Sequence, residues 1–200
     1  MLTDLMDYCL KKENFLDEKF CDNSIGILNK ATYKKHEWDG YGESFADDEA
    51  TNKADFATKY SEIVDFDNTS GTGIDEIDKH IIDNLHGAFL EYLGAFRYGW
   101  FRGWQGYTGI KFNRYLEGQE MRLHWDNIHS IFDGERKGVP ILSVIGLLND
   151  DYEGGDLEIA GNKTDMNKGD IVIFPCSFMY PHEVKTVTKG ERHSWVSWLW

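Results

Sequence analysis

Residues 168–200 read KGDIVIFPCSFMYPHEVKTVTKGERHSWVSWLW and contain three short segments rich in β-branched and aromatic residues. These segments lie at about 170–174, 183–188 and 192–200. The dipeptides Lys168-Gly169 and Lys189-Gly190 mark turns beside them. Short strands separated by glycine-containing turns are typical of β-sandwiches and barrels. The C-terminal part of the chain is therefore predicted to consist of short β-strands.

The same strand pattern extends upstream to about residue 97. Further predicted strands lie near 108–115, 120–126, 140–148 and 156–160. The pair Gly154-Gly155, between two of them, indicates a bulge or a close backbone approach, and an ordinary hairpin turn is the alternative. A β-barrel over about residues 97–200 follows from this succession of strands.

The first half of the chain has a different pattern. Residues 1–30 are predicted to be helical, with Asp17 as a helix cap, and 39–73 is a polar, loop-rich insertion. The clearest helix is 74–93, where apolar residues follow the three-four spacing of one buried stripe and Gly94 is the expected stop. The predicted fold class is α+β, a single domain over 1–200 in which helices within 1–96 brace the barrel.

Composition limits the possible partners. The 200 residues carry 21 Lys and Arg against 35 Asp and Glu, a net charge of −14. Such a surface repels phosphate backbones and anionic membranes, which argues against nucleic acid and membrane partners. The cysteines Cys9, Cys21 and Cys176 are predicted to be free thiols, and the chain start lacks the pattern of a signal peptide. A cytoplasmic protein is expected, and its oligomeric state stays open.

The tripeptide His124-Trp125-Asp126 is the first candidate for chemistry. Residues two apart on a strand point to the same face, so His124 and Asp126 can converge on one ion. Alone, this motif is also explained by a surface histidine beside a turn aspartate. His182 on a distant strand can complete a set of two histidines and one carboxylate, which leaves three positions open on a metal. His129 is a rival third ligand.

A second candidate group follows on the last strand. Arg192 comes ten residues after His182, and a strand, a turn and a strand would return its guanidinium to the neighbourhood of that histidine. A planar, permanently charged fork suits the far carboxylate of a dicarboxylic acid. Ser194 is two residues further, on the same face, and can add a hydroxyl donor.

Several motifs together resemble the prolyl 4-hydroxylase family of iron(II)- and 2-oxoglutarate-dependent dioxygenases. They are, in the family's order, Tyr115-Leu-Glu-Gly-Gln-Glu-Met-Arg-Leu-His124-Trp-Asp126, Leu147-Leu-Asn-Asp-Asp-Tyr-Glu-Gly-Gly-Asp-Leu157, Lys168-Gly-Asp-Ile-Val-Ile-Phe-Pro175, His182 and Lys189-Gly-Glu-Arg192-His-Ser194. The resemblance covers about residues 108–200 and implies a double-stranded β-helix with a metal at its mouth.

The resemblance also implies roles for individual residues. His124, Asp126 and His182 would bind Fe(II) and form the catalytic centre. Arg192, with Tyr115 and Ser194, would bind 2-oxoglutarate, the co-substrate consumed with O2. Trp198 and Leu157 would form walls of the co-substrate pocket, and ascorbate is implied as an optional reductant.

The substrate follows less directly from the residues. Leu147 and Met121 stand where the family commonly has Tyr, and Arg192 stands where collagen-type members usually carry Lys. The expected reaction is hydroxylation of a prolyl residue in a peptide or protein, with decarboxylation of 2-oxoglutarate to succinate. A hydroxylase of a free amino acid or another small molecule is the alternative, and a non-catalytic metal-binding barrel is the alternative of another class.

Overall fold

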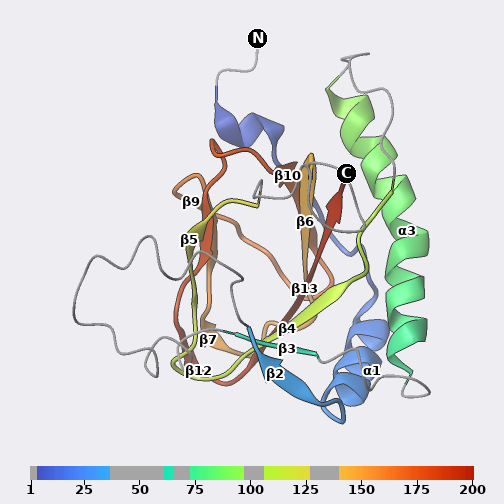
Figure 1. Ribbon diagram of the computed structural model, residues 1–200, viewed down its shortest axis with the longest axis vertical. Coiled ribbons are helices and arrows are strands. Elements are labelled where there is room, and N and C mark those ends of the chain that lie inside the picture. The colour runs from blue at the N-terminus through green and yellow to red at the C-terminus, as the bar shows by residue number, and fades with distance from the viewer. Residues whose placement is uncertain (1–3, 37–60, 65–72, 97–105, 127–139) are drawn as a thin grey trace.

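The structure is a computed structural model that describes residues 4–36, 61–64, 73–96, 106–126 and 140–200. Its strands form two main sheets that face one another, and every strand pair is antiparallel (Figure 1). The larger sheet has the order β1 (Leu10–Lys12), β10 (Ile171–Pro175), β6 (Leu142–Leu147), β13 (Arg192–Leu199), β4 (Lys111–Tyr115), β3 (Glu62–Val64) and β2 (Tyr33–Lys35). The smaller sheet has the order β5 (Met121–His124), β11 (His182–Val184), β8 (Leu157–Ile159) and β9 (Asn162–Lys163), and β12 (Val187–Lys189) pairs separately with β7 (Glu153–Gly154).

Alternation along β13 determines which side chains face the inside of this two-layered barrel. Trp195 and Leu199 are fully buried in the core on the helix side, whereas Val196 packs with the core between the sheets. Successive strand residues point to opposite faces, so Arg192 and Ser194 share the inner face with Val196. The helix-side packing is tight: a Cβ on Gly146 of β6 would lie 2.1 Å from the Trp195 ring.

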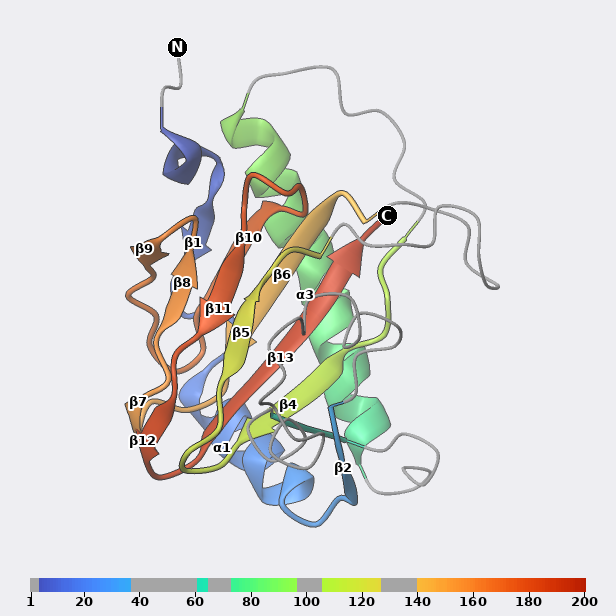
Figure 2. The same cartoon turned by 60° about the vertical axis from the view of Figure 1, so that its left-hand side comes forward.

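Helix α3 (Ile74–Ala95) covers the outer face of the larger sheet (Figures 1 and 2). The predicted apolar stripe is confirmed by buried side chains at Ile74, Ile77, Ile81, Leu85 and Phe89, with Leu93 partly buried. Gly94 is not the stop, because the helix continues to Ala95 and is capped at Phe96. Asp78 of α3 accepts a hydrogen bond from the Ile110 amide at 2.7 Å, which ties the helix to the chain entering β4.

The N-terminal region is only partly helical, which corrects the prediction for residues 1–30. A 3-10 turn (Leu5–Tyr8) is followed by β1 and then by α1 (Glu18–Leu28). Asp17 caps α1 as predicted, because its side chain accepts a hydrogen bond from the Phe20 amide at 2.8 Å. β1 is a strand because β10 offers it a free edge, and tertiary pairing of this kind overrides local preference.

Two short strands, β2 and β3, lie in the first half of the chain, where helices and a loop-rich insertion were predicted. β2 and β3 pair with each other, and β3 pairs with β4, so they extend the larger sheet beyond the predicted barrel. β3 lies within the insertion predicted at 39–73; most of that insertion falls outside the described residues. Within the part of the chain that is described, no helix combines the length and apolar character needed to cross a membrane.

Candidate metal centre

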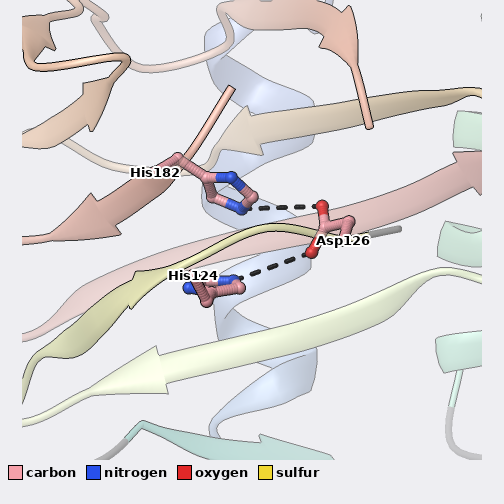
Figure 3. Close-up of side chains that lie close together, drawn as sticks. All are labelled: His124, Asp126 and His182. Carbon is pink, nitrogen blue, oxygen red and sulfur yellow. Dashed lines mark ion pairs between the residues drawn. The ribbon is translucent and has the colours of Figure 1, made fainter. Parts of the chain in front are cut away.

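Three predicted ligands lie close together, with their polar atoms pointing towards one another (Figure 3). His124 ends β5, His182 begins β11, and the two residues are directly paired across the strands. Asp126 lies just past the end of β5, with Oδ1 3.6 Å from His124 Nε2 and Oδ2 3.5 Å from His182 Nε2. All three ligand atoms lie within 4.8 Å of one another.

Backbone carbonyls orient both imidazoles. The Nδ1 atom of His124 is 2.6 Å from the carbonyl oxygen of Arg122, and that of His182 is 3.2 Å from the carbonyl oxygen of Tyr180. A carbonyl only accepts, so each Nδ1 carries the hydrogen and each Nε2 carries the lone pair. This is the arrangement in which histidines bind metals, with the second nitrogen held by the protein.

The protonation states also suit a metal. Burial, followed by the neighbouring His182, lowers the pKa of His124 to about 4, so this imidazole is neutral at pH 7. Burial acts to raise the pKa of Asp126, but the facing histidines and a hydrogen bond from Ser143 outweigh it and hold that pKa below its usual value. A neutral imidazole and an ionised carboxylate are the forms that coordinate a cation.

Two nitrogens and one oxygen, converging from one side, match the donor set of a 2-His-1-carboxylate iron site. Among the described residues, this is the one group of three or more potential ligands that could hold a metal ion. The rival ligand His129 lies outside the described residues. These three side chains therefore fit a divalent transition metal such as iron(II).

Arg192, at the start of β13, is 2% exposed and lies among the other predicted site residues. Its Nη1 donates to Ser194 Oγ at 2.8 Å, and its guanidinium carbon is 5.1 Å from the centre of the Tyr115 ring. Burial raises the pKa of Tyr115, so its hydroxyl stays protonated and able to donate. Within the described part of the chain, Arg192 Nε is buried with no hydrogen-bond partner.

The backbone approaches Arg192 closely at Gly155. A Cβ on this glycine would lie 3.0 Å from Arg192 Cδ, and its φ of +64° is one that other residues rarely adopt. The pairing of β7 with β12 is also irregular here. Of the predictions for Gly154-Gly155, the close backbone approach is confirmed.

A pocket of about 170 Å³ opens beside Arg192. It is lined by Leu147, Tyr152, Gly155, Asp156, Leu157, Lys163, Thr164, Asp165, Met166, Asn167 and Arg192. Leu157 is thus brought together with Arg192. Trp198, by contrast, lies beside the metal ligands, where its indole contributes to the low pKa of Asp126.

Two residues near the metal ligands were not predicted to have a role. Ser143 Oγ donates a hydrogen bond to Asp126 Oδ2 at 2.5 Å, and Cys176 Sγ lies 3.0 Å from the same hydroxyl. The signal in the sequence was weak: a single hydroxyl within the apolar run 139–148. The three cysteines are free thiols, as predicted.

Comparison with known sequences identifies relatives of the C-terminal half. The sequence model of the 2OG-Fe(II) oxygenase superfamily matches residues 110–200. A PKHD-type hydroxylase of Psychrobacter sp. (strain PRwf-1) is 34% identical over 95 residues, which are 44% of this chain and 36% of that protein. A PKHD-type hydroxylase of Alteromonas mediterranea is 33% identical over 96 residues, 44% of this chain and 41% of that protein. The chain thus spans roughly two fifths of the length of these curated relatives.

Solved structures resemble the whole described fold. A prolyl hydroxylase from Trichoplax adhaerens, in complex with a hypoxia inducible factor peptide fragment, has a TM-score of 0.65 at 17% identity over 97% of this chain and 84% of that one. A viral collagen prolyl hydroxylase from Paramecium Bursaria Chlorella virus-1, in complex with 2OG, has a TM-score of 0.59 at 16% identity over 96% and 94%.

These likenesses confirm the predicted double-stranded β-helix. The superfamily match falls on the segment that carries His124, Asp126, His182 and Arg192. Iron(II), 2-oxoglutarate and O2 are the cofactor and co-substrates that this match implies. Over residues 110–200 the chain is thus similar to the 2OG-Fe(II) oxygenase superfamily, and its fold resembles that of solved prolyl hydroxylases.

Proposed function

We propose that this protein is an iron(II)- and 2-oxoglutarate-dependent dioxygenase that hydroxylates a prolyl residue of a peptide or protein. The observation that carries the proposal is the pairing of a converging His-Asp-His group with a buried arginine inside one barrel. We also propose that the barrel and the helices within 1–96 act as a single domain, because α3 packs along the larger sheet.

In this proposal His124, Asp126 and His182 hold the iron. The bound iron and 2-oxoglutarate together supply the oxidising chemistry, in which O2 and the keto-acid yield succinate, carbon dioxide and one oxygen atom for a substrate C–H bond. Two imidazoles and one carboxylate would leave coordination positions for the co-substrate and O2. The remaining residues bind, orient and shield the reactants.

Arg192 would anchor the far carboxylate of 2-oxoglutarate. Because Nη1 is engaged by Ser194, the partnerless Nε and the adjacent Nη2 remain for a side-on, two-bond pairing with a carboxylate. The Tyr115 hydroxyl would add a neutral donor. Leu157 would form the apolar wall beside Arg192, and Trp198 would shield the site next to Asp126.

Several observations support a prolyl substrate in a peptide. The structurally similar proteins include prolyl hydroxylases, one of them solved with a peptide fragment. A net charge of −14 favours encounter with neutral or basic segments. Two residues favour the alternative, a free amino acid or other small molecule: Met121 is packed in the inner core and Leu147 lines the pocket beside Arg192, both in place of the tyrosines common in the family.

The test is mass spectrometry of candidate substrates incubated with the protein, iron(II), 2-oxoglutarate and O2, with and without ascorbate. Proline-containing peptides and a panel of free amino acids and metabolites form the two arms, and Asp126→Ala is the inactive control. A gain of one oxygen atom on proline, with equimolar succinate, supports the proposal. Oxygen gain only on small molecules would establish the alternative, and metal and 2-oxoglutarate binding without succinate in any arm would identify a non-catalytic barrel.

A further inference from the structure

We infer that Ser143 is a positioning residue that fixes the orientation of the Asp126 carboxylate, and that Cys176 orients Ser143 in turn. The inference rests on the proposed role of Asp126 as a metal ligand. It concerns which atoms of the chain keep that ligand in place.

Asp126 needs such support because of its position in the fold. It lies beyond the last residue of β5, so strand pairing holds His124 but does not extend to Asp126. Ser143 belongs to β6, which lies between β10 and β13 in the larger sheet, whereas β5 belongs to the smaller sheet. A hydroxyl on this central strand, fully buried at 0% exposure, is a rigid reference point for a carboxylate on the facing sheet.

Counting protons fixes the direction of the hydrogen bonds. The ionised carboxylate of Asp126 only accepts, so the single hydroxyl hydrogen of Ser143 is donated to Oδ2 at 2.5 Å. Ser143 Oγ therefore has no hydrogen left for Cys176, and the thiol must donate to Oγ across their 3.0 Å separation. Cys176 therefore donates a hydrogen bond to Ser143, and Ser143 donates one to Asp126.

These two hydrogen bonds limit how the Asp126 carboxylate can bind a metal. Oδ2 accepts the Ser143 hydrogen bond and lies 3.5 Å from His182 Nε2, while Oδ1 lies 3.6 Å from His124 Nε2, so rotation of the carboxylate about its axis would break the Ser143 bond. Without the hydroxyl the carboxylate can rotate away from this orientation, and its oxygens are then no longer held towards the two histidines.

The experiment is an anaerobic titration of the full chain with iron(II) alone, followed by intrinsic tryptophan fluorescence. Ser143→Ala is expected to weaken iron affinity by about 10–100-fold, the usual cost of losing a group that supports a metal ligand. Ser143→Thr keeps the hydroxyl and should stay within a few-fold of wild type. The matched control is Ser197→Ala, which removes an equally buried hydroxyl that bonds the Thr108 carbonyl and does not contact the metal ligands.

The Cys176 variants test the second link. Cys176→Ala should weaken iron binding less than Ser143→Ala, and Cys176→Ser should restore it by supplying a new donor. The visible spectrum of the cobalt(II)-loaded protein gives a readout independent of affinity: it should change in Ser143→Ala and match wild type in Ser197→Ala. Near-ultraviolet circular dichroism reports whether each variant is folded. If Ser143→Ala does not fold, Cys176→Ala and Ser143→Thr carry the test.

The outcomes separate this inference from the proposed function. Wild-type affinity and an unchanged cobalt spectrum in a folded Ser143→Ala variant would overturn the positioning role while the metal site stands. Equal iron(II) affinity in Cys176→Ala and wild type would show that Cys176 does not orient Ser143. Failure of the wild-type protein to bind iron(II) or cobalt(II) would instead overturn the proposed function.

Discussion

Replacement of Arg192 is the most quantitative test of the co-substrate site. The guanidinium is 2% exposed, and with Nη1 bonded to Ser194 it has Nε and Nη2 left for a carboxylate. A hydrogen bond to a charged group contributes about 1.5–3 kcal/mol. Loss of two such bonds in Arg192→Ala should cost about 3 kcal/mol or more, a weakening of 2-oxoglutarate binding by at least about 100-fold. Arg192→Lys keeps the charge and one bond, so about 10-fold is expected.

The assay is an anaerobic titration of the metal-loaded protein with 2-oxoglutarate. Arg114→Ala is the matched control, because Arg114 lies on the neighbouring strand β4 and pairs with Glu62 instead of entering the inter-sheet space. A keto-acid without the far carboxylate, 2-oxobutyrate, should bind wild type and Arg192→Ala about equally. If folded Arg192→Ala binds 2-oxoglutarate as tightly as wild type does, Arg192 does not anchor the co-substrate.

Asp126, His36 and Gly155 provide three further tests. Asp126→Ala should abolish iron-dependent turnover while circular dichroism shows a folded domain; wild-type turnover would end its assignment as a ligand. Burial and then Lys111 lower the pKa of His36 to about 3, so the unfolded chain takes up a proton below pH 6.5 that the folded chain does not. Urea unfolding of the metal-free protein should therefore show a free energy of unfolding that falls as the pH drops from about 6.5 towards 3. His36→Asn should make this pH dependence shallower, whereas His80→Asn, at an exposed position, should leave it unchanged. Equal pH dependence in wild type and both variants would contradict the low pKa of His36. Gly155→Ala should weaken 2-oxoglutarate binding because the new Cβ would meet Arg192. Gly161→Ala is the control: it has a similar φ of +75° with open space around it, so it should lose only about 1–2 kcal/mol of stability. Equal 2-oxoglutarate affinity in the two variants would show that the close approach at Gly155 does not position Arg192.

The features predicted best from the sequence are those with a strong periodic or motif signal. The buried stripe of α3 was predicted because five of its apolar residues follow one helical face and pack against the sheet. The convergence of His124 with Asp126 followed from strand alternation, and His182 was placed by motif order. The tertiary pairing of His182 with His124 then accounts for the proximity of their rings, at 4.2 Å between centroids.

The features that the sequence did not predict depend on contacts between distant segments. β1, β2 and β3 are only three residues long, too short for a periodic pattern, and each is a strand because a neighbouring edge completes its hydrogen bonds. Ser143 and Cys176 lie 17 and 50 positions from Asp126 along the chain, and only the facing of the two sheets brings them to the carboxylate.

The proposed function requires that this barrel couples consumption of 2-oxoglutarate to substrate oxidation at an iron centre. The most direct measurement is succinate formed by the iron(II)-loaded protein from 2-oxoglutarate and O2, across the peptide and small-molecule panels, for wild type and Asp126→Ala. Succinate is expected with the wild-type protein, increased by one class of substrate and matched by a gain of one oxygen atom in that substrate. Succinate no higher in wild type than in Asp126→Ala, with every substrate, would contradict it.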